Sequence, residues 1–158
     1  MLRKNFFILA LPVIFFACGK SGSDCVNTGG RPTTEEISTV QNYLSTNGIT
    51  ATQDARGFYY QVIGPGYGTS FPTVASNVTV KYKGTLPNGS VFDSTAGNTT
   101  ASFALSNVIL GWQYGVPLVK KGGVINLYLP PSLGYGCGGS GTIPSNSMLI
   151  FRVEVVNY

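Results

Sequence analysis

Residues 77–94 read NVTVKYKGTLPNGSVFDS, and this stretch decides the fold. Apolar and polar side chains alternate over residues 78–83, which is the period-two pattern of a half-buried β-strand. The pair Asn88-Gly89 follows, and these residue types favour the tight turn of a β-hairpin. Residues 91–94 then begin the returning strand. The stretch therefore predicts two antiparallel strands joined by a short turn.

The same pattern recurs on both sides of this hairpin. We predict further strands in the segments GFYYQVI, ASFALS, VINLYLP and MLIFRVEVVNY, which occupy residues 57–63, 101–106, 124–130 and 148–158. A short helix is predicted from VILGWQYGV, residues 108–116. Five or more strands with so little helix indicate an α+β fold, in which an antiparallel sheet packs against a single helix.

Residues 33–48, TTEEISTVQNYLSTNG, predict a separate N-terminal helix. Thr33 or Thr34 can cap its first turn, and the glutamates that follow suit the positive end of the helix dipole. Gly48 suits its C-terminal end. The apolar residues fall on one face, so we expect this amphipathic helix of about 13 residues to be stable only when it docks on another surface.

Composition limits the possible classes of function. Of the 158 residues, 43% are hydrophobic and 10% are charged, which fits a folded domain with many turns and does not fit disorder. The formal net charge is +4, and it falls to +2 when Arg3 and Lys4 are set aside with the N-terminal segment. The other basic residues are scattered, whereas nucleic-acid binding needs a clustered basic surface. We therefore expect no nucleic-acid partner.

The first 20 residues, MLRKNFFILALPVIFFACGK, are typical of an export signal. A basic start, an apolar run and a small residue before a break predict a signal peptide over residues 1–17. The junction before Cys18 resembles a bacterial lipoprotein signal, in which the cysteine becomes the lipidated first residue. We expect an exported protein, lipid-anchored to the cell-envelope membrane through a polar tether (residues 18–33) and facing the periplasm or the outside. Simple secretion is the alternative.

The two remaining cysteines, Cys25 and Cys137, leave two possibilities open. An oxidising compartment would let them form a disulfide, and free thiols are the alternative. The chain has no histidine and no CxxC motif, so we expect no metal site and no cofactor.

Reactive side chains do not explain a function. Without histidine there is no catalytic triad, and the chain has neither a GxSxG motif nor a phosphate-binding glycine loop. On residue types alone the chain would be a binding domain. Asp93 stands out, because it is one of only six acidic residues and directly follows the apolar pair Val91-Phe92.

Four segments in a fixed order change that interpretation. VTVKYKGTLPNGSVFDS, VILGWQYGVPLVKKGG, LPPSLGYG and GTIPSNSMLIFRVEV closely resemble the FKBP-type peptidyl-prolyl cis-trans isomerases. The resemblance covers about residues 57–158 and implies an FKBP-like antiparallel sheet of five or six strands curled around one short helix. Together with the N-terminal features, it divides the chain into a signal peptide (1–17), a lipidated tether (18–33), an N-terminal helix and linker (34–56) and an isomerase domain (57–158).

The resemblance also implies a pocket, whose residues carry over position by position. They are Tyr82, Phe92, Asp93, Val108, Ile109, Trp112, Tyr135, Ile143 and Phe151. Asp93, Tyr135 and Trp112 are the expected catalytic residues, and the others are expected to bind substrate. Trp112 would form the floor beneath a proline ring, while the backbone N–H of Ile109 and the hydroxyl of Tyr135 would bind carbonyls. Asp93 would accept a hydrogen bond from Tyr82 and polarise the site without exchanging a proton.

The implied activity is peptidyl-prolyl cis-trans isomerisation, which breaks no covalent bond and so needs no nucleophile. The implied partners are proline-containing segments of exported proteins, and macrolide inhibitors. The long dimerising helix of some secreted relatives has no counterpart in these residues, so we expect a monomer.

Two other functions fit the same residues. A non-catalytic chaperone or envelope assembly module would hold proline-containing segments in the same pocket. A purely structural β-domain would fill that pocket with its own side chains. Each residue alone also has an ordinary role, since Tyr82 or Phe151 could be a core residue and Asp93 could cap a turn.

Three positions depart from the family pattern. Ala101 stands where many relatives have an aromatic residue, so one wall of the pocket would be open. Ser140 lies in a loop that lacks a common His-Pro pair. Pro117 would end the short helix soon after Trp112, because proline has no N–H to donate and clashes with the preceding turn.

Overall fold

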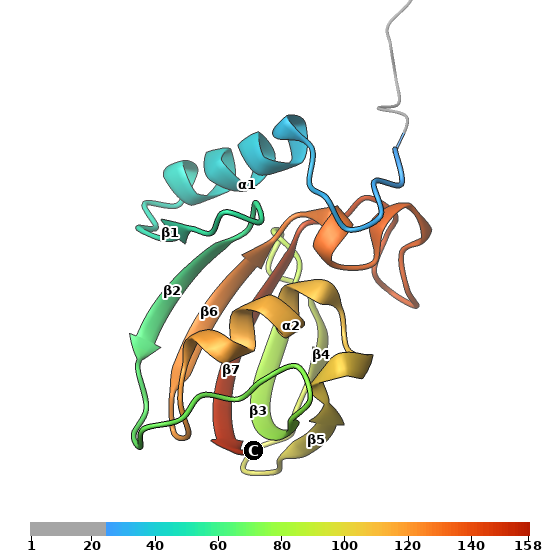
Figure 1. The fold of residues 1–158 in the computed structure, drawn as a ribbon. Coiled ribbons are helices and arrows are strands. Elements are labelled where there is room, and N and C mark those ends of the chain that lie inside the picture. Colours follow the sequence, from blue (N-terminus) through green and yellow to red (C-terminus); the bar gives the residue numbers. More distant parts are fainter. Residues whose placement is uncertain (1–24) are drawn as a thin grey trace, which may run out of the picture.

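The computed structural model of the protein describes residues 25–158, so the expected signal peptide (residues 1–17) and the lipidation site Cys18 lie outside the described part. Within that part, an antiparallel sheet carries a helix on each face (Figure 1). No helix of the described residues is both long and apolar enough to cross a membrane.

The sheet has seven strands in the order β1-β2-β6-β7-β3-β4, with β5 also paired to β3. Their bounds are β1 Thr52–Gln53, β2 Tyr59–Gly64, β3 Asn77–Thr85, β4 Val91–Ser94, β5 Ala101–Ala104, β6 Val124–Leu129 and β7 Leu149–Asn157. Every pairing is antiparallel, which confirms the predicted sheet. The strand beyond the expected six is β1, in the segment expected to be a linker. Two residues are too few to show a period in the sequence.

Strands β4 and β5 pair with different halves of β3 and together form one interrupted edge. β5 pairs with residues 77–80, and β4 pairs with residues 83–85. The backbone of Tyr82, between these halves, bonds to Thr95 on this side instead of to a strand. The turn from β3 to β4 is the predicted hairpin, and Gly89 closes it with a φ of 85° that glycine adopts easily. Tyr82 therefore lies where the edge of the sheet is broken.

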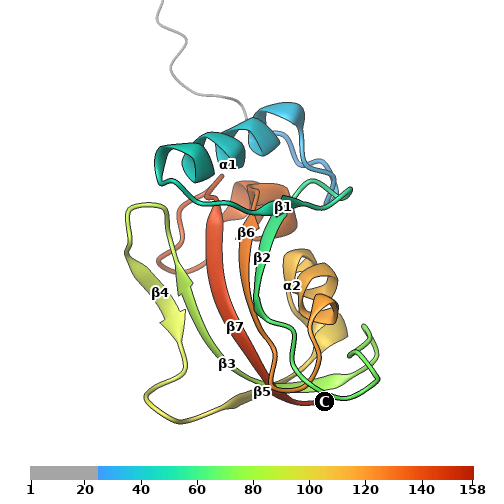
Figure 2. The same ribbon diagram turned by 90° about the vertical axis from the view of Figure 1, so that its left-hand side faces the viewer.

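The helix on the inner face of the sheet is α2, Leu110–Gly115, flanked by the 3-10 turns η1 (Leu105–Asn107) and η2 (Val116–Leu118). The predicted short helix is confirmed, and Pro117 lies in η2, where it ends the α-helical pattern. A Cβ atom at Gly111 or Gly115 would overlap a leucine of β6. These glycines let α2 approach the sheet closely, and the sheet curves around it (Figure 2). Trp112 of α2 thereby joins the main hydrophobic core.

The helix on the outer face is α1, Thr34–Thr46, which confirms the second predicted helix. The Thr33 hydroxyl accepts a hydrogen bond from the Glu36 N–H at 3.2 Å, and the Glu36 carboxylate accepts one from the Thr33 N–H at 2.8 Å. This reciprocal pair is a capping box. Val40 and Leu44 are buried against two tyrosines of the sheet and against Met148. The helix is thus docked on an apolar surface, as its short length requires.

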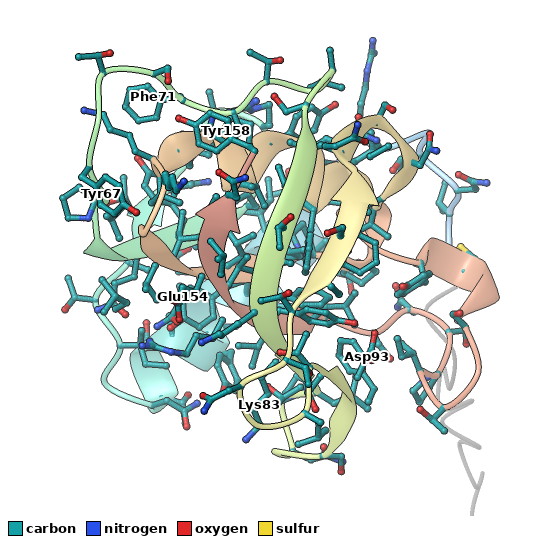
Figure 3. The ribbon with its side chains drawn as sticks, turned by 90° about the horizontal axis from the view of Figure 1, so that it is seen from below. Tyr67, Phe71, Lys83, Asp93, Glu154 and Tyr158 are labelled. Atoms are coloured by element: carbon teal, nitrogen blue, oxygen red, sulfur yellow. A yellow bond between two sulfur atoms is a disulfide. The ribbon has the colours of Figure 1, made fainter. Side chains whose placement is uncertain are left out.

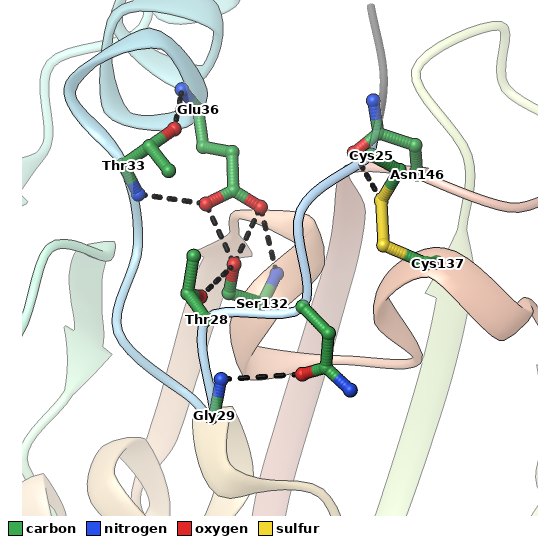
Figure 4. Close-up of a disulfide and its surroundings, with 9 residues drawn as sticks. Cys25, Thr28, Gly29, Thr33, Glu36, Ser132, Cys137 and Asn146 are labelled. Atoms are coloured by element: carbon green, nitrogen blue, oxygen red, sulfur yellow. Dashed lines mark hydrogen bonds between the residues drawn. A yellow bond between two sulfur atoms is a disulfide. The ribbon is translucent and has the colours of Figure 1, made fainter.

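Residues 25–33, which we call the N-terminal strap, lie along the loop that connects β6 to β7 (Figure 4). Cys25 and Cys137 form a disulfide with their Cα atoms 5.5 Å apart. The pairing that the sequence left open is therefore formed. It joins the start of the strap to the 3-10 turn η4, Gly136–Gly138.

Hydrogen bonds fasten the strap further along. The Thr28 hydroxyl donates to the Ser132 hydroxyl oxygen at 3.0 Å, in the turn η3, Pro131–Leu133. The N–H and hydroxyl of Ser132 both donate to the Glu36 carboxylate, at 3.0 and 2.6 Å (Figure 4). Residues 25–33 were expected to belong to a polar tether, but in the structure they are packed on the domain.

Candidate functional site

An open cavity of about 300 Å³ lies on the inner face of the sheet, between the β3–β4 edge and the N-terminal end of α2. Its lining residues are Tyr82, Phe92, Asp93, Phe103, Asn107, Val108, Ile109, Trp112, Tyr135 and Phe151. Eight of the nine pocket residues predicted from the sequence are among them. Ile143 is the exception, and Phe103 and Asn107 are additional members.

The wall of the cavity is an edge-to-face cluster of aromatic rings built around Trp112. The rings of Tyr82, Phe103 and Phe151 meet Trp112 at centroid distances of 5.2, 5.9 and 5.3 Å and interplanar angles of 84–90°. Phe92 extends the cluster by packing on Phe151 at 5.4 Å. Such T-shaped contacts are the favoured geometry for aromatic pairs, so the rings hold one another in place. The packed rings thus form a continuous apolar wall of the cavity.

Tyr82 and Asp93 form a hydrogen bond at the rim of this apolar surface. The Tyr82 hydroxyl donates to Asp93 Oδ2 at 2.5 Å, and the Asp93 side chain is exposed at the open edge of the sheet (Figure 3). Burial and, next, the bond to Asp93 raise the pKa of the Tyr82 phenol well above its usual value. The phenol therefore keeps its proton near neutral pH, and the Asp93 carboxylate is held at a fixed position beside the aromatic rings.

Thr95 fixes the backbone that carries this pair. Its hydroxyl accepts a hydrogen bond from the Tyr82 N–H at 3.1 Å, and its own N–H donates to the Tyr82 carbonyl at 3.0 Å. Thr95 thus replaces a strand partner at the break in the sheet edge, two residues after Asp93. Sequence reasoning missed this residue, because a lone threonine in a turn has no distinctive spacing.

The chain before α2 presents a backbone donor to the cavity. Gln113 holds this chain by donating from Nε2 to the Val108 carbonyl at 2.8 Å. The carbonyl of Ile109 accepts from the N–H groups of Trp112 and Gln113, at 3.0 and 3.2 Å. The N–H of Ile109, in contrast, has no acceptor in the described part of the chain. It is free to donate to a ligand carbonyl.

Trp112 carries a second unused donor. Its side chain is only 4% exposed, and Nε1 is the one buried side-chain polar atom without a hydrogen-bond partner among residues 25–158. An unpaired buried donor costs roughly 1–3 kcal/mol. An unpaired buried donor in a native structure calls for an explanation, and a catalytic role is one of those known.

Comparison with known proteins agrees with this geometry. The sequence model of the family described as FKBP-type peptidyl-prolyl cis-trans isomerase matches residues 68–156, more than half of the chain. The chain belongs to this family. Every residue that lines the cavity lies inside the matched range.

Two bacterial proteins illustrate what this FKBP-type domain is similar to. FkpA of Buchnera aphidicola subsp. Schizaphis graminum, a peptidyl-prolyl cis-trans isomerase, is 39% identical over 119 residues, which are 75% of this chain and 46% of that protein. The isomerase Mip of Coxiella burnetii is 43% identical over 105 residues, 65% of this chain and 45% of that protein. The chain spans about half the length of the curated relatives it matches.

Solved structures agree with the fold. FkpA from Escherichia coli superposes with a TM-score of 0.70 at 36% identity, covering 78% of this chain and 59% of that one. An isomerase from Pseudomonas syringae gives a TM-score of 0.66 at 26% identity, over 80% and 95% of the two chains. The FKBP fold predicted from the sequence is thereby confirmed.

Two features of the site differ from the expectation. Ile143 does not line the cavity, because two hydrogen bonds with Ser140 close a tight turn that folds it inward, leaving it 7% exposed in the core. The wall expected to be open at Ala101 is lined by Phe103, two residues further along β5. Residues two apart share a face of a strand, so the period-two pattern could have indicated Phe103. Asn107 carried no such signal.

Proposed function

We propose that this protein catalyses cis-trans isomerisation of Xaa-Pro bonds in polypeptides. The observation that carries the proposal is the cavity itself. Its floor is Trp112, which is only 4% exposed, and this floor adjoins the hydrogen-bonded pair of Tyr82 and Asp93. Membership of the FKBP-type family supports it. The site needs no metal or cofactor, because the reaction is a rotation.

The physical obstacle to this reaction is the resonance of the amide, which sets a barrier of about 18–20 kcal/mol. When the bond twists, conjugation is lost and the amide becomes less polar than its planar form. An apolar, water-poor cavity therefore favours the twisted state over the planar one, and the barrier falls. This is why a chain without histidine can be an enzyme.

The lining residues divide into three groups by role. Trp112 lies beneath the proline ring, and Tyr82, Phe92 and Phe151 enclose it. The Ile109 N–H and the Tyr135 hydroxyl hold substrate carbonyls, while Val108 adds apolar surface beside them. Tyr135 is suited to this role because it is 40% exposed at the mouth of the cavity. Asp93 presents its negative charge to the rotating amide without transferring a proton.

The decisive measurement is exchange between the cis and trans forms of a short Xaa-Pro peptide, followed by NMR with the full chain and its disulfide intact. We expect the wild-type protein to accelerate exchange and Asp93→Asn to reduce kcat/KM by roughly tenfold, since hydrogen bonds to charged groups contribute about 1.5–3 kcal/mol. Asp54→Asn is the matched control, because Asp54 pairs with Arg56 at 2.7 Å outside the cavity. Peptide binding without faster exchange would instead identify a proline-binding chaperone module, and absence of both would leave a structural domain.

We further propose that the protein is exported as a monomer and anchored through lipidated Cys18. The Cys25–Cys137 disulfide supports export, because reducing systems keep cytosolic thiols free. Exported proteins with slow Xaa-Pro bonds are then the substrates, and macrolide inhibitors compete for the same cavity. Mass spectrometry of the mature N-terminus tests the anchor, and a Cys18→Ala variant recovered in the soluble fraction with no lipid mass would support it. An unprocessed or unmodified N-terminus in the wild-type protein would contradict it.

A further inference from the structure

A second cavity borders the proline pocket and shares one residue with it. This groove, of about 210 Å³, lies between the N-terminal strap and the loop that connects β6 to β7. Its lining residues are Cys25, Val26, Asn27, Thr28, Glu36, Ser132, Gly134, Tyr135, Gly136, Cys137 and Gly138. We call it the strap groove. Because Tyr135 lines both cavities, the two cavities adjoin at this residue.

The walls of the strap groove are largely main chain. Three glycines form one side, where no side chain beyond Cα covers the main chain, although the Gly134 N–H and the Gly136 carbonyl are already bonded within the loop. On the other side, no hydrogen bond within residues 25–158 uses the backbone of residues 26–28. Exposed main-chain donors and acceptors of this kind bind an extended polypeptide backbone.

The strap groove is already formed before any ligand binds. The disulfide from Cys25 to Cys137 fixes one end of the strap, and the hydrogen bond from Thr28 to Ser132 fixes it three residues later (Figure 4). Binding therefore does not require the strap to become ordered, which is the usual cost when a loop closes on a ligand. The groove is preorganised for its occupant.

The electrostatic character of the strap groove is acidic. Glu36 is the only acidic or basic residue among its lining residues, and its carboxylate accepts hydrogen bonds from Ser132 and Thr33. These bonds orient the carboxylate without neutralising its charge. The groove therefore disfavours an acidic segment and accepts a neutral or basic one.

We propose that the strap groove binds the stretch of substrate chain that flanks the isomerised bond, as an extended segment of neutral or basic character. The inference rests on the proposed function, because it needs the proline ring to occupy the neighbouring cavity. The strap lies outside residues 68–156, which match the family, whereas the loop on the other side of the groove lies inside that range. The protein thereby recognises unfolded polypeptides better than isolated proline dipeptides.

The test compares a core peptide of four residues around Ala-Pro with versions extended by four Gly, Ser and Lys residues on either side. For the wild-type protein, we expect kcat/KM to rise about fivefold to tenfold on one of the two extended peptides, the ratio that one or two added hydrogen bonds give. The same peptide with Glu in place of Lys should lose most of this gain. The Lys preference should weaken at high salt, because ions screen it.

A variant that fills the strap groove gives the sharper result. A Cβ atom added at Gly138 would meet no other atom within 4 Å, and the φ of Gly138 is not left-handed, so the backbone and the space at this position accept the first side-chain atom of Gly138→Leu. Gly64 of β2 has the same two properties and lies on another side of the molecule, so Gly64→Leu is the matched control. In Gly138→Leu, we expect the extended peptide to lose its higher kcat/KM, while the kcat/KM of the core peptide stays at the wild-type value. In Gly64→Leu, both kcat/KM values should stay as in the wild type.

Two results would overturn the proposal: equal kcat/KM for core and extended peptides in the wild type, or an undiminished gain in Gly138→Leu. If no peptide is isomerised at all, the proposed function fails, and the groove is then tested by binding alone. Backbone amide shifts of Gly134, Gly136 and Gly138 would move with the extended peptide and not with the core peptide if the groove binds. Unmoved shifts would refute the groove in that case.

Discussion

The two faces of the sheet are covered by helices of different construction. On the inner face, α2 has 6 residues and belongs to a core cluster of sixteen buried residues. On the outer face, α1 has 13 residues, is capped at its start, and belongs to a cluster of five. The inner cluster includes Trp112 and Phe151, which are also walls of the cavity. Stability and binding in the aromatic cavity are thus coupled on the inner face and separable on the outer face.

The largest effect should come from the inner face. Trp112→Ala removes the floor of the cavity and is expected to lower the free energy of unfolding by about 3–5 kcal/mol. Binding of a proline peptide should be lost at the same time. Denaturant unfolding measures the first and NMR titration the second. Leu127→Ala, at a fully buried position of the same core that does not line the cavity, should destabilise the protein but keep peptide binding in the folded fraction. Equal loss of peptide binding in Trp112→Ala and Leu127→Ala would mean that Trp112 affects binding only through the stability of the core.

The outer face should lose stability without losing activity. Leu44 is 4% exposed and packs in the outer cluster, so Leu44→Ala should cost about 2–4 kcal/mol. The kcat/KM for a short Xaa-Pro peptide should stay at the wild-type value, measured at a temperature where the variant is folded. A lower kcat/KM in the folded variant would mean that α1 contributes to the inner site after all.

A smaller effect is expected at the first turn of α1. Thr33→Ala removes the side-chain half of the capping box and should cost about 1 kcal/mol of unfolding free energy. Thr33→Ser keeps the hydroxyl oxygen and should recover most of it. Denaturant unfolding of the two variants under the same conditions makes the comparison. Equal losses in both would show that the methyl group, and not the cap, stabilises this end of the helix.

The last prediction concerns the stability of the protein at alkaline pH, which depends on one tyrosine on each face of the sheet. Near neutral pH this effect is the smallest of the four. Burial, as the largest cause, raises the pKa values of both Tyr82 and Tyr128, and at Tyr82 the hydrogen bond to Asp93 adds to it. The folded protein therefore binds these protons more tightly than the unfolded chain. Stability should be unaffected below about pH 9 and should fall as the pH rises past the ordinary phenol value of about 10. Between pH 8 and pH 11, the free energy of unfolding should fall less in Tyr82→Phe and in Tyr128→Phe than in the wild type. An unchanged loss in both would mean that other groups control alkaline unfolding.

Much of this architecture could be predicted because its signals are local. The alternation over residues 78–83 and the Asn88-Gly89 turn indicated the central hairpin, and the threonine and glutamates before Ile37 located α1. The cavity residues could be placed because most of them fall in short segments whose order resembles a known family. Val108, Ile109 and Trp112, for example, lie within five consecutive positions.

The features that sequence reasoning missed depend on contacts between distant parts of the chain. Cys25 and Cys137 are 112 positions apart, and nothing in their local sequence indicates whether they meet. The packing of the strap on Ser132 likewise joins parts of the chain that are distant in sequence. Ile143 is not among the residues that line the cavity, and it lies in a turn closed by backbone hydrogen bonds with Ser140, which the residue types do not specify.

The Cys25–Cys137 disulfide also determines how the domain responds to mechanical force. When the protein is pulled at its two ends, tension that reaches Cys25 passes through the two sulfur atoms to Cys137, since the covalent path is shorter there. Residues 26–136, which include both helices and six of the seven strands, lie outside the stretched path. Only the segment after Cys137, with β7, can be drawn out. A pull on the N-terminal side of the strap would therefore peel the last strand from the sheet while the rest of the chain stays closed in a covalent loop.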